Sequence, residues 1–104
     1  MKLKIVKFKS VTSTNDEAIK LIRSNRCILG LVSADSQTKG RGTMGKKWIS
    51  YKGNIFISIF FKANLIKLKI ENYLTINAKI VKKILNEYTK KIVKIKKPND
   101  LLID

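Results

Sequence analysis

The stretch Gly40-Arg41-Gly42-Thr43-Met44-Gly45-Lys46-Lys47-Trp48 combines three glycines with a cluster of cations and ends on the only tryptophan of the chain. Glycine lacks a Cβ, so its backbone N–H group can approach an anion closely. Arg41 and the lysines around it can neutralise that anion, and the face of Trp48 can cover a flat ring. Taken alone, the stretch is equally compatible with a flexible basic hairpin. The flanking sequence is needed to distinguish that interpretation from a loop that binds an anion attached to a flat ring.

Four further motifs flank this stretch in a fixed order. Ser13-Thr14-Asn15 and Asp35-Ser36-Gln37-Thr38 precede it, and Asn54-Ile55-Phe56-Ile57-Ser58 and Lys96-Lys97-Pro98-Asn99-Asp100 follow it. In this order and at this spacing, the set resembles the catalytic domain of biotin protein ligases, which are related to lipoate ligases. The resemblance covers residues 5–104, and the ordered combination makes it far more specific than any single motif.

The resemblance implies a fold and an activity. The fold is α+β, a mixed or antiparallel sheet with helices on one face, and residues 1–104 would form a single, partial catalytic domain. The activity is the ATP- and Mg²⁺-dependent conversion of biotin to biotinyl-AMP, followed by transfer of biotin to a lysine of an acidic biotin-accepting domain of a carboxylase. We expect no protein-held metal, no membrane partner and a cytoplasmic location.

The same resemblance assigns the site residues. Arg41 is the expected catalytic cation, because it neutralises repulsion between the biotin carboxylate and the triphosphate. The expected biotin contacts are Ser13, Thr14, Asn15, Gln37, Gly40 and Arg41. The expected adenylate and ATP contacts are Gly42, Thr43, Gly45, Trp48, Asn99 and Asp100. Backbone N–H groups of the three glycines would assist in binding the phosphates.

Several of these residues also have ordinary structural explanations. Thr14 could be only a helix N-cap, Trp48 could be a core anchor, and Asn99-Asp100 is a common turn sequence after proline. Two positions depart from the family pattern: Thr43 replaces an arginine that grips the adenylate, and Lys97 replaces a tryptophan. The chain reaches Asp104 where the family continues into a strand carrying a lysine, so a truncated, non-catalytic remnant is the alternative.

The net charge of +16 would also suit a nucleic-acid-binding domain. However, 20 of the 23 cations are lysines spread along the chain, whereas base readout and bidentate phosphate contacts favour arginine. Nucleic acid is therefore an unlikely partner, and the charge better suits electrostatic attraction of an acidic acceptor. With one cysteine and no histidine, the chain has no internal disulfide and offers little for zinc. No apolar run approaches 18 residues, as a spanning helix would require.

Hydrophobic periodicity predicts the elements. A capping box from Thr14 to Glu17 indicates a helix that runs to about Ser24. The apolar run 27–34, which includes Cys27 as a small buried hydrophobe, predicts a strand covered on both faces, and residues 35–47 are polar and glycine-rich enough to predict a loop. The other predicted elements are strands at 3–8, 54–62, 92–96 and 101–103 and a long helix at 71–91.

Overall fold

The computed structural model describes residues 2–62 and 69–104, which divide into two compact units, Met1–Asn64 and Leu65–Asp104. Each unit has its own sheet, with four strands in the first and two in the second. In chain order the elements are β1 (Lys4–Val11), α1 (Thr14–Arg23), β2 (Leu29–Arg41), the 3-10 turn η1 (Thr43–Gly45), β3 (Lys47–Ser50), β4 (Phe56–Phe61), α2 (Ile70–Asn86), β5 (Val93–Lys96) and β6 (Asp100–Ile103).

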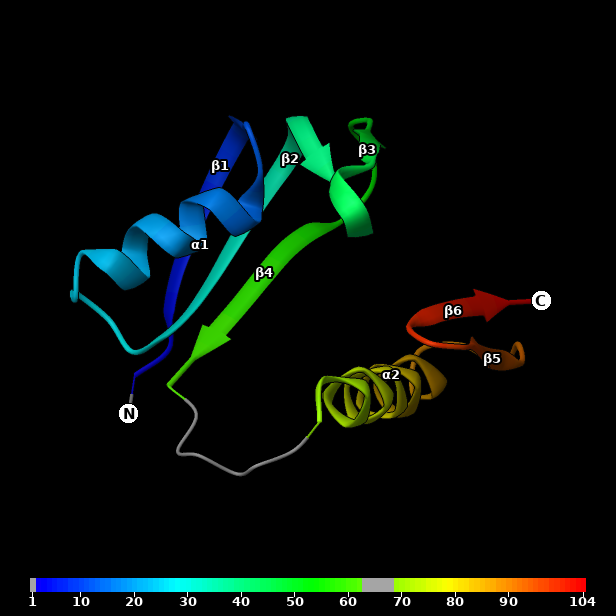
Figure 1. Cartoon of the computed structure of the whole chain (residues 1–104). Helices are drawn as coiled ribbons and strands as arrows, with labels where there is room; N and C mark the ends of the chain where they lie inside the picture. Colours follow the sequence, from blue (N-terminus) through cyan, green and yellow to red (C-terminus); the bar gives the residue numbers. More distant parts are fainter. Residues whose placement is uncertain (1, 63–68) are drawn as a thin grey trace. The chain divides into compact units, whose positions relative to one another are not determined.

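The 13-residue strand β2 is the centre of the first unit. It pairs in parallel with β1 along one edge. On the other edge its first half pairs antiparallel with β4 and its second half antiparallel with β3. Mixed pairing agrees with the predicted α+β class, and Figure 1 shows α1 lying across one face of the sheet.

The predicted loop over residues 35–47 is wrong for most of its length. Residues 35–41 continue β2 and pair with both β1 and β3, and only residues 42–46 connect β2 to β3. Polar and glycine-rich composition suggested a loop, but backbone pairing with β1 as far as Gln37, and with β3 from Gln37 to Arg41, holds this segment extended whatever its side chains are. The strand β3 was not predicted at all, because its four residues are too few to show a period.

Helix α1 begins one residue earlier than the capping box predicted. Ser13 is the N-cap, and its Oγ accepts a hydrogen bond from the backbone N–H of Asp16 at 3.3 Å. The interpretation of Thr14 as an N-cap is therefore wrong, because Thr14 is the first residue inside the helix. The helix ends at Arg23 with Ser24 as its C-cap, as predicted.

The core of the first unit lies between α1 and the sheet. Val32 is fully buried and clusters with Ala18 of α1 and Phe60 of β4, and Cys27 packs against this cluster as a partly buried hydrophobe. Alternate residues of β2 are buried, namely Gly30, Val32 and Ala34, whereas those between them are only partly covered. The strand is therefore covered fully on one face, not on both as its continuous apolar run suggested.

The second unit joins one helix to a hairpin. Strands β5 and β6 pair antiparallel through a turn over residues 97–99, in which the Lys97–Pro98 peptide bond is cis. Both predicted strands are confirmed, and helix α2 is confirmed with an earlier end, at Asn86. Ala78 of α2 and Val93 of β5 are the buried residues of this unit. Across the described residues, no helix has the length and apolarity needed to cross a membrane.

Candidate functional site

A small polar pocket lies at the N-terminal end of α1. Its volume is about 200 Å³, and its lining is mostly polar. Five of the six predicted biotin contacts line it, and only Gly40 does not. The lining residues are Ser13, Thr14, Asn15, Gln37, Arg41, Trp48, Ile55, Phe56, Ile57 and Ser58. Residues up to 45 positions apart in sequence therefore meet at one place, which is the arrangement that the motif order implied.

The walls of this polar pocket are held by a hydroxyl network. The Oγ1 atom of Thr14 and the Oγ atom of Ser58 are 2.8 Å apart, and both residues are buried. The Ser58 hydroxyl also donates to Oδ1 of Asn15. Ser58 belongs to the motif Asn54–Ser58, but it was not among the predicted site residues. Alternation along the Asn54–Ser58 motif is the signal that could have placed this side chain on the face that α1 covers.

Gln37 links the pocket to strand β3. Its side-chain oxygen accepts a hydrogen bond from the backbone N–H of Thr14 at 2.7 Å, and its Nε2 donates to Oγ of Ser50 at 3.1 Å. The first bond satisfies one of the backbone donors that a helix leaves free at its N-terminus. Gln37 thereby fixes the start of α1 relative to the β2–β3 hairpin, and one Nε2 hydrogen remains for a ligand.

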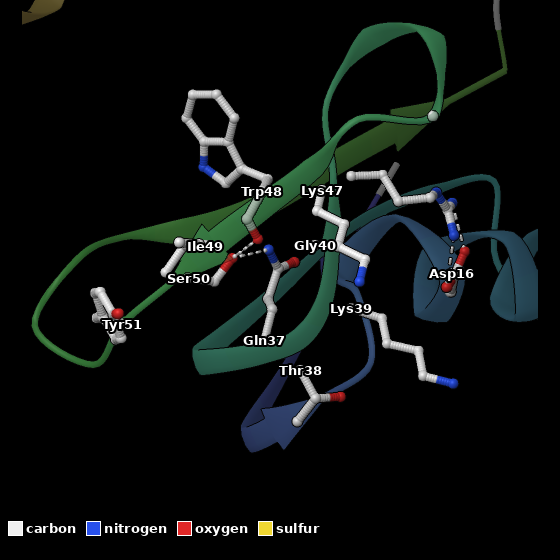
Figure 2. A pocket seen from close by; sticks show the side chains of 12 residues that line it. Asp16, Gln37, Thr38, Lys39, Gly40, Lys47, Trp48, Ile49, Ser50 and Tyr51 are labelled. Carbon is white, nitrogen blue, oxygen red and sulfur yellow. Dashed lines mark hydrogen bonds and ion pairs between the residues drawn. The ribbon is translucent and has the colours of Figure 1, made fainter.

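A second, wider pocket opens on the β2–β3 hairpin, with a volume of about 640 Å³ (Figure 2). Trp48, Ile49 and Tyr51 give it an apolar wall, and three cations line it as well: Lys39, Arg41 and Lys47. The side chain of Trp48 points away from Gln37 in Figure 2, and the residue is 62% exposed. The interpretation of Trp48 as a core anchor is therefore wrong, and its ring is available to a flat ligand.

Arg41 lines both pockets and is held by Asp16. Its NH1 and NH2 groups donate to the two carboxylate oxygens at 2.9 and 2.6 Å. This bidentate bond and the charge of Arg41 lower the pKa of Asp16, and the same contacts raise the pKa of Arg41. Both side chains remain in contact with solvent, so salt screens the pair. Asp16 was not among the predicted site residues, although its position in the first turn of α1 is one that favours a carboxylate.

The glycines of the hairpin have different structural roles. A Cβ on Gly40 would overlap neighbouring strand atoms, whereas one on Gly42 would make only ordinary contacts. Gly45 has a φ of 72°, which favours glycine. The N–H of Gly42 donates to the carbonyl of Lys46 at 2.6 Å. This N–H is thus bonded within the hairpin, and its contact with an anion stays a prediction.

Asn99 and Asp100 lie in the second unit. Asn99 belongs to the β5–β6 turn and lines a separate groove of about 370 Å³, together with Leu74, Asn77, Ala78, Val81 and Leu101. Asp100 begins β6 opposite Lys96. The interpretation as a turn sequence is therefore confirmed for Asn99 and wrong for Asp100, which is already a strand residue. Contact of the two residues with an adenylate stays a prediction. Among the described residues, no three His, Cys, Asp or Glu side chains are grouped as a metal site would need.

A helix N-terminus and a glycine-rich hairpin converge on a polar pocket here, as expected for the ligases that the motifs resemble. The comparison with known families agrees. Residues 7–104 match the biotin/lipoate A/B protein ligase family. Because the match spans nearly the whole chain, this chain belongs to that family.

Individual relatives point to the biotin branch. The chain is 33% identical, over 95 residues and 90% of its length, to the bifunctional ligase/repressor BirA of Bacillus subtilis (strain 168). Its fold matches the Leishmania major biotin protein ligase in complex with biotinyl-5-AMP, with a TM-score of 0.78 and 28% identity over 96% of the chain. It also matches the Aquifex aeolicus biotin protein ligase in complex with biotin and ATP, with a TM-score of 0.77 and 30% identity over 94% of the chain.

The chain spans only part of these relatives. It covers 29% of BirA, 47% of the Leishmania ligase and 40% of the Aquifex ligase. The substrates and activities of those longer proteins are therefore a proposal for this chain.

Proposed function

We propose that this chain binds biotin and ATP and forms biotinyl-AMP, as part of a single ligase domain to which both units belong. The observation that carries the proposal is the convergence of Thr14, Asn15, Gln37 and Arg41 on one polar pocket next to an exposed tryptophan. Thr14 and Asn15 come from the first turn of α1, and Gln37 and Arg41 come from the second half of β2.

The polar pocket offers chemistry that suits the cyclic urea of biotin. A urea presents one carbonyl acceptor flanked by two N–H donors, so its pocket needs both donors and acceptors. The hydroxyl of Ser13 can donate, that of Thr14 can accept, and the amides of Asn15 and Gln37 supply N–H groups. Lipoate, which has a dithiolane ring in place of the urea, would leave these groups unpaired at a cost in binding free energy.

Arg41 supports the activation step from its place between the two pockets. Bringing a carboxylate against a triphosphate requires neutralisation of their repulsion, and a guanidinium provides a permanent charge with a planar set of donors. Lys39 and Lys47 add charge in the wider pocket, where the ring of Trp48 would cover the adenine. Mg²⁺ would arrive with the phosphates of ATP, which supply most of its ligands in such sites.

The second step would transfer biotin to a lysine of an acidic acceptor domain of a carboxylase. A net charge of +16 supports this choice of partner, because opposite charges raise the rate of encounter. We expect the reaction in the cytoplasm, where ATP and carboxylases meet.

Calorimetry with biotin, followed by biotin-dependent exchange of pyrophosphate into ATP, tests the proposal. We expect biotin to bind, and Thr14→Val to weaken binding, because valine keeps the shape of threonine but removes the hydroxyl that lines the pocket. Thr12→Val is the matched control, since Thr12 is exposed and lies outside both pockets.

Each outcome has a distinct meaning. Biotin binding without exchange would identify a non-catalytic biotin-binding module. Thr43 is consistent with that outcome, because its neutral hydroxyl cannot replace the charge of the family's arginine. Absence of biotin binding, together with salt-sensitive DNA binding, would refute the proposal in favour of a nucleic-acid-binding domain.

A further inference from the structure

Ser58 is buried on β4 with its hydroxyl between two residues of the α1 N-terminus. It is 9% exposed and pairs with Val32 in the sheet, so the backbone around it is fixed by the core. The hydroxyl contacts both Oγ1 of Thr14 and Oδ1 of Asn15. Thr14 and Asn15 line the polar pocket beside it. Ser58 is therefore well placed to control how these two side chains face a ligand.

Counting protons settles the direction of each bond. A serine hydroxyl has a single hydrogen, and Ser58 donates it to Oδ1 of Asn15. The short contact between Ser58 and Thr14 must then be a bond in which Thr14 donates and Ser58 accepts. Two consequences follow for the pocket. Thr14 keeps only acceptor capacity for a ligand, and Asn15 keeps its Nδ2 group, which makes no other hydrogen bond within residues 2–62.

The backbone beneath these groups does not depend on Ser58. The N–H of Thr14 is held by Gln37, and the N–H of Asp16 is held by Ser13. Removing the Ser58 hydroxyl would therefore leave the helix N-terminus in place. What would change is the amide of Asn15, whose oxygen and nitrogen ends have nearly the same shape and exchange by a simple rotation.

We infer that Ser58 is a specificity-determining residue: it fixes the Asn15 amide with its N–H₂ end toward the ligand and Thr14 as an acceptor. A pocket with this polarity selects a neutral ring that presents a carbonyl oxygen beside an N–H group. It rejects a ring of the same shape that presents only N–H donors. This inference rests on the proposed biotin site and adds the residue that sets which ring chemistry the site accepts.

The test compares biotin with 2-iminobiotin, in which a guanidinium group replaces the urea and offers donors only. The measured quantity is the ratio of the two dissociation constants, by calorimetry at neutral pH. We expect the wild type to prefer biotin strongly. In Ser58→Ala, the Asn15 amide can rotate to offer its oxygen, so the ratio should fall at least about tenfold, the size of one hydrogen-bond mismatch.

Two further variants make the test specific. Ser33→Ala is the matched control, because Ser33 lies in the same sheet outside the polar pocket, and its ratio should equal that of the wild type. Asn15→Asp leaves Ser58 intact and lies at an exposed position. A carboxylate offers only acceptors, so this variant should reverse the preference toward 2-iminobiotin.

The results that overturn the inference differ from those that overturn the proposed function. If the wild type does not bind biotin, both fail. If it binds biotin but Ser58→Ala keeps the wild-type ratio, only the role of Ser58 fails. If Ser58→Ala does not fold, Asn15→Asp remains decisive. An unchanged ratio in Asn15→Asp would show that the Asn15 amide does not distinguish biotin from 2-iminobiotin, and the inference would fail.

Discussion

Replacing Gly40 by alanine should destabilise the protein, and the structure shows why. Gly40 pairs with Trp48 where the register between β2 and β3 shifts. A Cβ at this position would lie 2.6 Å from Oγ of Ser50, 2.8 Å from the backbone oxygen of Trp48 and 3.0 Å from Nε2 of Gln37. The Ser50 and Gln37 side chains could rotate away, but the Trp48 carbonyl belongs to the strand and cannot. The two strands must therefore move apart at this position, and the hydrogen bond between Gln37 and Ser50 must break.

The expected loss combines two effects. Overpacking of this kind costs about 1–3 kcal/mol. Loss of one side-chain hydrogen bond adds about 0.5–1.5 kcal/mol. The free energy of unfolding should thus fall by about 1.5–4.5 kcal/mol, and since a domain of this size loses about 4–8 °C per kcal/mol, the melting temperature should fall by at least about 6 °C.

Gly42→Ala is the matched control, two residues away in the same motif. Its Cβ would meet nothing closer than 3.7 Å, and its φ of −91° is open to any residue. Alanine should be neutral there, or stabilise by about 0.4–1 kcal/mol through a less flexible unfolded chain. Thermal unfolding followed by the fluorescence of Trp48 measures both variants. If Gly40→Ala and Gly42→Ala melt at the same temperature, the close packing of β2 against β3 is not what requires Gly40.

Three further predictions concern the charges of the site. Arg41→Ala should lower biotin-dependent pyrophosphate exchange by about ten- to a hundredfold, because it removes the planar, permanently charged donor between the two pockets; an unchanged rate in this variant would mean that Arg41 is not the phosphate clamp. Thr43→Arg should slow the release of biotinyl-AMP, measured by the loss of labelled adenylate on a filter, because it adds a second cation to the hairpin; faster release would contradict this. The ion pair with Asp16 should make stability depend on pH: since its carboxyl pKa is lowered from 3.8 in the folded state, the extra stability is present above that value and is lost as the pH falls through the lowered pKa. Asp16→Asn should thus be less stable than the wild type at pH 7 and equal to it in strong acid, whereas Glu17→Gln, which removes only a single contact with the exposed Lys20 side chain, should show a smaller difference at pH 7 in the same urea titrations; equal stability of Asp16→Asn and the wild type at both pH values would exclude a contribution from the pair.

The elements that the sequence predicts well are those with a clear period. Helices α1 and α2 and the hairpin β5–β6 carry regular apolar positions, turn residues or both, and they appear where they were expected. The second half of β2 was missed because its stability comes from backbone pairing, first with β1 and then with β3, which leaves no mark in the side chains of Asp35 to Arg41. The length of β2 is therefore set by the strands that pair with it and not by its own side chains.

For the site, motif order was more informative than local physics. The resemblance brought Thr14, Asn15, Gln37 and Arg41 together, and the structure places them around one pocket. It did not indicate that the Asp16 carboxylate of α1 would hold Arg41. Two residues that form an ion pair through the tertiary fold can stand at any separation in the sequence, so no motif shows the pair. The pairing partners of buried hydroxyls are hidden from sequence for the same reason.

The length of β2 has a consequence for how the molecule responds to ligands. One continuous strand carries Val32 in the core and Gln37 and Arg41 at the two pockets. The backbone amides along it are therefore protected by a shared set of inter-strand bonds, and a fluctuation that exposes the core also disorders the pocket walls. A ligand that binds only the closed pocket must then oppose opening along the whole strand, with a free energy set by its concentration and affinity. Ligand binding at the pocket end of β2 should therefore slow deuterium uptake by the backbone amides at its core end, around Val32.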